Sequence, residues 1–249
     1  MRRRLLNEFA RGFHLDAQDF ARQKVRLNSG PISNDASPRR LRALSRDLRK
    51  KWDGLCGKIH RVEKVCAAIL AGGASRRMGT PKALISVGGQ PLIARIAQTL
   101  REVFCEIVVV TSSPEIAAAA TLPRIEDALK NKGPLAGIHV ALTHFQAPTF
   151  CVACDMPNLN ADLIRLIVEQ RADFDVVVPR RGVRGEPLHA LWSPACLPMI
   201  EAELNRERVG PTTAIFDKLN VRFLEESELV DFGADVFDNW NFPDDIKQP

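Results

Sequence analysis

The sequence predicts an α/β fold in which a mostly parallel sheet carries one antiparallel element. Short apolar runs rich in valine and isoleucine alternate with longer segments whose apolar residues recur at helical spacing, a pattern typical of βαβ units. The composition agrees, since 45% of the 249 residues are hydrophobic and 26% are charged, as in ordinary globular proteins. Several apolar runs end in glycine or aspartate, which places polar groups at predicted strand ends.

The elements follow one another in regular order. Pro91 suits the first turn of a helix, Asn160 is the best N-cap for the helix that follows it, and Pro187 suits an edge strand or a strand start. The predicted strands are 65–71, 106–111, 123–127, 149–154, 174–179, 186–193 (the antiparallel member), 221–224 and 236–241, and the predicted helices are 91–104, 114–120, 133–145, 161–170, 194–204 and 212–219.

The N-terminal quarter differs from the rest in charge. Residues 1–62 carry 16 Lys and Arg against 6 Asp and Glu, whereas residues 63–249 carry 19 against 24. We therefore expect a basic, weakly ordered extension over 1–61 and a separate domain over 62–249. One alternative is an arm that binds nucleic acid or another anionic surface. Another is that translation starts at Val62, just before the first strand.

The sequence also predicts a cytoplasmic protein without a membrane partner. No apolar run approaches the roughly 18 residues that a membrane-spanning helix needs. The N-terminus is basic but lacks the continuous apolar core of a secretion signal.

The chemistry is expected beyond the carboxyl ends of the strands, where open α/β sheets bind ligands. The first strand runs into Gly72 and Gly73, which let the backbone turn closely beneath a phosphate. Arg76, Arg77 and Lys82 follow as cations for a polyphosphate. The spacing fits neither G-x-x-x-x-G-K-[ST] nor G-x-G-x-x-G, which argues against a simple ATPase or a dehydrogenase.

Three further residues follow the next predicted strands, namely Thr111, Asp127 and Asp155. Asp155 is the candidate Mg²⁺ ligand, because Mg²⁺ prefers oxygen ligands and bridges phosphates. Asp127 is a candidate for a ribose hydroxyl, a base edge or the metal through water. No Ser-His-Asp or Cys-His arrangement is evident. The residues therefore predict phosphorus chemistry, in which Mg²⁺, Lys82 and the arginines offset negative charge.

Candidate contacts for a second substrate lie later in the chain. His189 either faces the site or packs as a strand histidine. Asn239 and Asn241 present amides to a phosphate or a ring, or serve turn chemistry before Pro243.

These motifs resemble a known family, the MobA-type nucleotidyltransferases and, within it, the molybdenum cofactor guanylyltransferases. The similarity covers about residues 62–249, with the motifs in the family's order. The motifs are Leu70-Ala71-Gly72-Gly73-x-Ser75-x-Arg77-Met78-Gly79-x-x-Lys82, Gly133-Pro134-Leu135-Ala136-Gly137, Cys154-Asp155-Met156-Pro157, Glu186-Pro187-Leu188-His189-Ala190-Leu191 and Asn239-x-Asn241-x-Pro243-x-Asp245.

The resemblance implies a Rossmann-like three-layer α/β/α nucleotidyltransferase domain. It further implies Mg²⁺-dependent transfer of GMP from GTP to molybdenum-bearing molybdopterin, with release of pyrophosphate. Other molybdenum cofactor biosynthesis proteins or apo-molybdoenzymes are the expected protein partners, and nucleic acid is not expected.

The resemblance also implies roles for single residues. Lys82, Asp155 and Arg77 are the candidate catalytic residues, and Asp155 also binds the metal. Thr111 stands where the family often has Asn. The nucleotide-binding set is Leu70, Ala71, Gly72, Gly73, Arg76, Lys82, Thr111, Asp127 and Asp155, and the molybdopterin candidates are His189, Asn239 and Asn241.

Two alternatives remain open at this point. The first is a cytidylyltransferase of the same cofactor, or another transferase that makes a nucleotide-linked small molecule. The cytidylyl relatives usually carry Ala where this chain has Gly72. The second is a nucleic-acid-binding or regulatory protein acting through residues 1–62, which a steep salt dependence of binding would reveal.

Overall fold

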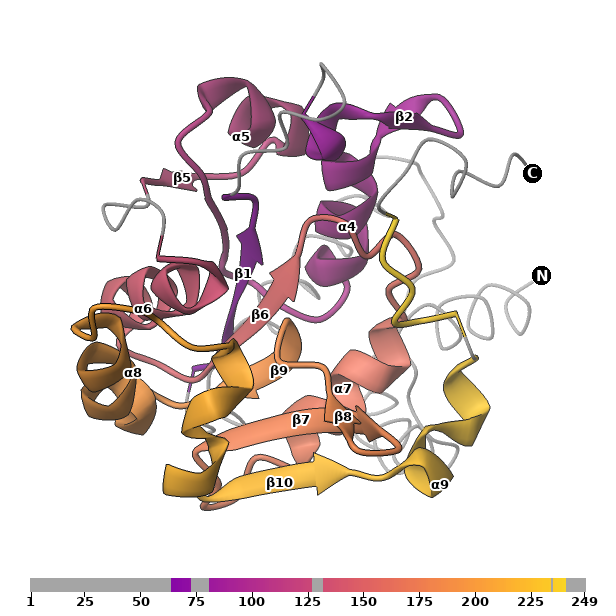
Figure 1. Ribbon diagram of the computed structural model, residues 1–249. Helices are drawn as coiled ribbons and strands as arrows, with labels where there is room; N and C mark the ends of the chain where they lie inside the picture. Colours follow the sequence, from indigo (N-terminus) through magenta and orange to yellow (C-terminus); the bar gives the residue numbers. More distant parts are fainter. Residues whose placement is uncertain (1–63, 73–80, 127–131, 234, 241–249) are drawn as a thin grey trace, which may run out of the picture. The chain divides into compact units, whose positions relative to one another are not determined.

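A computed structural model describes residues 64–72, 81–126, 132–233 and 235–240 (Figure 1). The predicted extension over 1–61 lies outside the described residues. The strands are β1 Cys66–Leu70, β2 Ser86–Val87, β3 Gln90–Pro91, β4 Ile107–Val110, β5 Arg124–Ile125, β6 Thr149–Ala153, β7 Val176–Arg181, β8 Arg184–Gly185, β9 His189–Trp192 and β10 Val221–Leu224.

One large sheet organises the described chain. Its strand order is β10-β7-β9-β6-β1-β4-β5, with β8 paired to β7, while β2 and β3 form a separate hairpin. Strand β1 pairs in parallel with both β4 and β6, and β5 pairs in parallel with β4. Strand β9 is antiparallel to both of its neighbours, β6 and β7. The short strand β8 is antiparallel to β7 as well. The prediction of a mostly parallel sheet with an antiparallel element is confirmed.

Helices cover both faces of the sheet (Figure 1). On one face α4, α5 and α7 enclose a core that includes alternate residues of β1, β4 and β6. On the other face α6 and α8 pack over the residues in between. The helices are α4 Leu92–Arg101, α5 Pro114–Ala120, α6 Pro134–Phe145, α7 Ala161–Glu169, α8 Leu197–Leu204 and α9 Glu226–Leu229, with short 3₁₀ helices at Lys82–Leu84, Pro194–Cys196, Thr212–Lys218 and Val230–Phe232.

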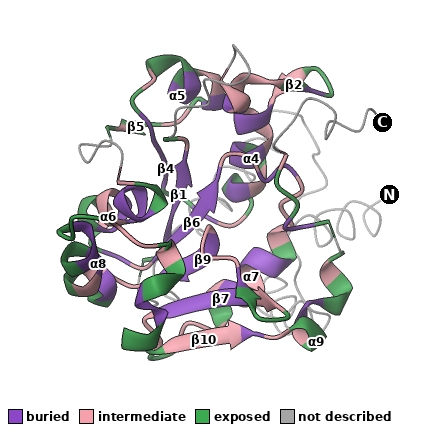
Figure 2. Cartoon of the chain, viewed as in Figure 1, coloured by how far each residue is buried: buried purple, intermediate pink, exposed green. Residues whose placement is uncertain are grey.

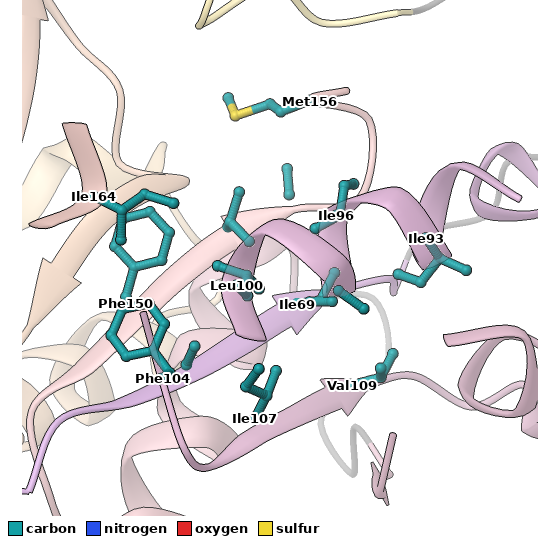
Figure 3. Packing of buried hydrophobic residues seen from close by; sticks show 14 of the residues in the cluster. Ile69, Ile93, Ile96, Leu100, Phe104, Ile107, Val109, Phe150, Met156 and Ile164 are labelled. Atoms are coloured by element: carbon teal, nitrogen blue, oxygen red, sulfur yellow. The ribbon is translucent and has the colours of Figure 1, made fainter. Parts of the chain in front are cut away.

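The central strands are buried on both faces, as their purple colour in Figure 2 shows. All five residues of β1 and all five of β6 are buried. Figure 3 shows Ile96 and Leu100 of α4 close to Ile69 of β1, and the ring of Phe104 stacks on that of Phe150 with centroids 5.8 Å apart. Burial of large apolar side chains contributes about 1.5–3 kcal/mol each, so this packing fixes the strands whose ends form the site.

Helix α7 confirms the predicted cap. The Asn160 side-chain oxygen accepts hydrogen bonds from the backbone N–H groups of Asp162 and Leu163, at 2.9 and 3.2 Å. This is the arrangement that satisfies the unpaired donors of a helix start.

Pro187 lies just before β9, at the strand start that was one of the two predicted options, and so removes no ladder bond from this strand, which lies inside the sheet. Two expectations require correction. The helix predicted over 212–219 is a 3₁₀ helix. No strand forms in the described part of 236–241. The Asp238 N–H closes a turn onto the carbonyl of Asp235, and the Trp240 N–H donates to the carbonyl of Asp155, so these groups form no ladder with a neighbouring strand. Within the described residues, no helix is long and apolar enough to cross a membrane.

Candidate active site

A hollow of about 570 Å³ lies at the edge of the sheet where the parallel strands end. Its walls include the ends of β1 and β6, the start of α6, the turn between β8 and β9, and the start of the 3₁₀ helix Thr212–Lys218. The hollow brings together four predicted nucleotide-site residues, Leu70, Gly72, Lys82 and Asp155, and one predicted second-substrate residue, Asn239. The predicted convergence of strand ends therefore holds for β1 and β6.

The end of β1 is held in place by hydrogen bonds to both neighbouring strands. The Ala71 N–H donates to the carbonyl of Val110 at 3.0 Å, and the Cys154 N–H donates to the carbonyl of Leu70 at 3.2 Å. These bonds continue the ladder to the point where the glycine turn begins. The backbone at Leu70 and Ala71 is thus held in place beside the hollow.

The second glycine of the Gly133–Gly137 motif lets α6 approach this strand end. A Cβ placed on Gly137 would lie 3.2 Å from Cδ2 of Leu70, which is closer than side chains normally pack. Gly133 has φ of 74°, in the region that favours glycine. The motif therefore allows the close approach of α6 to Leu70 at Gly137 and the positive φ before the helix at Gly133.

Asp155 and Lys82 form the charged centre of the hollow. The Lys82 Nζ lies 3.8 Å from Asp155 Oδ2, and the two side chains are 20% and 24% exposed. Burial raises the pKa of the Asp155 carboxyl, and the neighbouring Lys82 ammonium opposes that rise. Partly buried charges are screened less than surface charges. A polyphosphate entering here would meet a lysine already oriented toward the strand end.

The C-terminal part of the described chain is tied to Asp155. The Trp240 N–H donates to the backbone carbonyl of Asp155 at 2.9 Å. Nearby, the Asn158 amide donates to Asp235 Oδ2 at 3.1 Å. These bonds hold Asn239 at the rim of the hollow, next to the loop that carries the carboxylate.

The arrangement suits a magnesium ion shared with substrate phosphates. Mg²⁺ in such sites takes one or two protein carboxylates and completes its shell with waters and phosphate oxygens. Asp155 supplies one carboxylate of this kind at the hollow. Among the residues that the structure describes, no three His, Cys, Asp or Glu side chains gather as a dedicated metal cage. The single carboxylate of Asp155 fits the one or two protein ligands that such a metal takes.

Thr111 is placed at the end of β4 but does not line the hollow. It is 1% exposed. Its N–H donates to the carbonyl of Ile125, and its hydroxyl accepts from the N–H of Ser113 at 3.2 Å. The backbone N–H and the hydroxyl of Thr111 are therefore both used in hydrogen bonds to β5 and to the turn that leads into α5.

His189 is also buried away from the hollow. Its ring lies edge-on to Phe150 and Phe237, with centroid distances of 5.2 and 5.1 Å. Burial lowers the pKa of the imidazole to about 3. Neither ring nitrogen has a hydrogen-bond partner in the described part of the chain. The geometry corresponds to the packed alternative for His189.

Five predicted site residues fall outside the described residues, namely Gly73, Arg76, Arg77, Asp127 and Asn241. Ala71, by contrast, is described and contributes the hydrogen bond to Val110 given above. Sequence reasoning missed other residues of the hollow, including Arg184, Glu186, Thr212 and Thr213. Glu186 belongs to a motif that carried the resemblance, so its position in that motif was the available signal. Thr212 and Thr213 belong to none of these motifs, so no signal in the sequence pointed to them.

Comparison with known families gives the same picture. The family model described as the MobA-like NTP transferase domain matches residues 67–221, from β1 to the start of β10. The chain belongs to the MobA-like NTP transferase family. It is therefore a nucleotidyltransferase, and the glycine turn, Lys82 and Asp155 lie within the matched region.

Named relatives of this MobA-like protein cover most of the described domain. It is 38% identical over 182 residues to a probable molybdenum cofactor guanylyltransferase of Pelotomaculum thermopropionicum, covering 72% of this chain and 88% of the relative. It is 35% identical over 185 residues to the molybdenum cofactor guanylyltransferase of Desulfosudis oleivorans, covering 72% and 90%.

A solved structure is similar as well. The molybdopterin-guanine dinucleotide biosynthesis protein A of Archaeoglobus fulgidus superposes with a TM-score of 0.63 at 26% identity, covering 72% of this chain and 94% of that chain. A 4-diphosphocytidyl-2C-methyl-D-erythritol synthase of Anaerococcus prevotii superposes with a TM-score of 0.55 at 14% identity, which shows a shared fold alone. The three-layer α/β/α architecture is thus that of MobA-like transferases.

Proposed function

We propose that this protein transfers GMP from GTP to molybdenum-bearing molybdopterin and releases pyrophosphate. The similarity to named guanylyltransferases supports this assignment. We further propose that residues 62–249 form the catalytic domain and that Mg²⁺ is required.

The observation that carries the proposal is the pairing of Lys82 with Asp155 beside the end of β1. GTP and an acceptor phosphate both bring negative charge into the hollow. Lys82 offsets part of this charge, and the glycine turn allows backbone N–H groups to approach the phosphates. Asp155 is the residue that would hold Mg²⁺, which supplies further positive charge at the phosphates when bound.

The proposed reaction is a substitution at the α-phosphorus. An oxygen of the acceptor's terminal phosphate bonds to this phosphorus, and the bond to the β-phosphate oxygen breaks. Pyrophosphate carries away the electron pair, and the product contains a new phosphoric anhydride. The protein's contribution is to align the two phosphates and to stabilise the charge that develops between them.

The test is GTP-dependent formation of the dinucleotide product by the full chain, compared between wild type and Asp155→Asn. We expect the variant to lose product formation by at least about 100-fold, since it removes the carboxylate that would hold the metal. Asp173→Asn, at an exposed position away from the hollow, is the matched control and keeps wild-type turnover. Undiminished activity of Asp155→Asn would reject the proposed role.

Base choice is tested separately. GTP and CTP are offered side by side, with pyrophosphate release as the readout. We expect turnover with GTP to exceed turnover with CTP. A preference for CTP would replace the guanylyl assignment with the cytidylyl alternative and leave the role of Asp155 intact.

A further inference from the structure

Glu186 occupies the turn between β8 and β9 and lines the hollow. Its backbone is fully engaged within the turn. The Glu186 N–H donates to the carbonyl of Pro179 at 2.9 Å, and its own carbonyl accepts from the N–H of His189 at 2.9 Å. The side-chain carboxylate is therefore the group that Glu186 has to offer to a ligand.

This carboxylate is half-buried without a close partner. In the part of the chain that the structure describes, no hydrogen bond or ion pair reaches it. Burial raises the pKa of the carboxyl, while Arg184 and Arg181 act from a distance in the opposite direction. A ligand that brings hydrogen-bond donors would give this carboxylate the partners that no described side chain supplies.

The strand order indicates which substrate Glu186 faces. Strand β6, which ends at Asp155, separates β1 from β9 in the sheet. Leu70 and Gly72, at the end of β1, therefore lie on one side of Asp155, and the turn before β9 lies on the other. If the nucleotide phosphates sit at the glycine turn, as proposed above, Glu186 lies in the half of the hollow left for the acceptor. Thr212 and Thr213 also line the hollow.

A carboxylate is a specific partner for two adjacent N–H groups. The 2-amino-4-oxo-pyrimidine ring of a pterin presents such a pair at its N3–H and 2-amino positions, and both can bond to the two oxygens of one carboxylate. We propose that Glu186 binds this edge of the acceptor's pterin ring and so selects the acceptor. This inference rests on the proposed function, since that function supplies the pterin.

Guanine carries the same edge, so the experiment must separate the two sources. The full-length wild type and Glu186→Gln are titrated with pterin and with lumazine, which has an oxygen in place of the 2-amino group, following ligand fluorescence. In parallel, KM is measured for molybdopterin and for GTP. Glutamine keeps the size of the side chain but replaces one acceptor oxygen with a donor. Glu169→Gln, an exposed change at the end of α7, is the matched control.

We expect the wild type to bind pterin at least about tenfold more tightly than lumazine. In Glu186→Gln this preference disappears and KM for molybdopterin rises by about tenfold or more, while KM for GTP stays within about twofold. Glu169→Gln behaves as wild type. Equal pterin preference in wild type and Glu186→Gln would overturn the proposal.

A second outcome also overturns it. If Glu186→Gln raises KM for GTP and loses discrimination between GTP and ITP, the carboxylate binds guanine instead. Failure of the proposed function is seen differently, as absence of GMP transfer by the wild type. The pterin and lumazine titrations do not depend on turnover, so the two failures are distinguishable.

Discussion

The buried histidine of β9 makes stability depend on pH in a defined direction. The folded chain holds the pKa of His189 at about 3, whereas the unfolded value is about 6.5. Above pH 6.5 the ring is neutral in both states. As the pH falls below 6.5 the unfolded chain takes up a proton and the folded chain does not, until about pH 3. Stability is therefore lost on acidification.

The size of the loss follows from the interval between the two pKa values. Each pH unit in this interval costs about 1.4 kcal/mol. At pH 5, about 1.5 units below the unfolded value, the contribution is a loss of about 2 kcal/mol. That is a substantial part of the roughly 5–15 kcal/mol that stabilises a typical domain.

The measurement is urea unfolding at pH 7.5 and pH 5 for the full chain and for His189→Leu. Leucine does not titrate, and it removes two ring nitrogens that lack partners among the described residues. Arg181, whose guanidinium lies over the Phe237 ring, and Glu186, which accepts the backbone N–H of residue 189, are present in both proteins. Their contributions therefore cancel to first order.

We expect the free energy of unfolding of the wild type to fall by about 2 kcal/mol more than that of His189→Leu between the two pH values. His144→Gln, which changes an exposed histidine, should retain the wild-type difference. Equal pH sensitivity of the wild type and His189→Leu would refute the reasoning, because it would mean that the ring is protonated as readily in the fold as in the unfolded chain.

Three further predictions concern the wall of the hollow and the helix cap. Lys82→Met should lower GMP transfer by about 100-fold or more while the urea midpoint changes little; unchanged steady-state turnover would contradict its role. Gly137→Val should lower the free energy of unfolding by about 1–3 kcal/mol, because its side chain meets Leu70, and wild-type stability would show that the contact relaxes freely. Asn160→Ala should cost about 1 kcal/mol, whereas Asn160→Ser should retain most of the cap; equal losses in both would argue against capping.

The regular elements were accessible from the sequence because their local signals agree with the tertiary fold. The apolar run at 65–71 predicted β1, and the proline and alanine pattern at 114–120 predicted α5. The conformation of the described part of 236–241 could not be predicted in this way. Its alternation resembles a strand, but the Trp240 N–H donates to the carbonyl of Asp155 and not to a neighbouring strand, and that contact joins residues distant in sequence.

The site shows the same division. Gly72, Lys82 and Asp155 were predictable because each follows a strand end or a motif whose chemistry is local. Burial of Thr111 was not predicted, and the sequence left two alternatives open for His189, since both outcomes depend on neighbouring elements that a single segment does not specify. Glu186 was overlooked although it stands in a motif that carried the resemblance, because the location of its carboxylate at the hollow is revealed only by the three-dimensional arrangement.

The reversed direction of β9 has a consequence for how such a site can diversify. A parallel strand at this position would bring its last residues to the hollow and its first residues to the far edge. Because β9 runs the other way, the turn that precedes it, with Glu186 and Pro187, lies at the reacting edge instead. The direction of β9 thus places the β8–β9 turn at the hollow, in addition to the end of β1, and this requires no change in β1 or β6. If Glu186 binds the acceptor as proposed, substitutions in that turn would change which acceptor is admitted without altering the end of β1, Lys82 or Asp155.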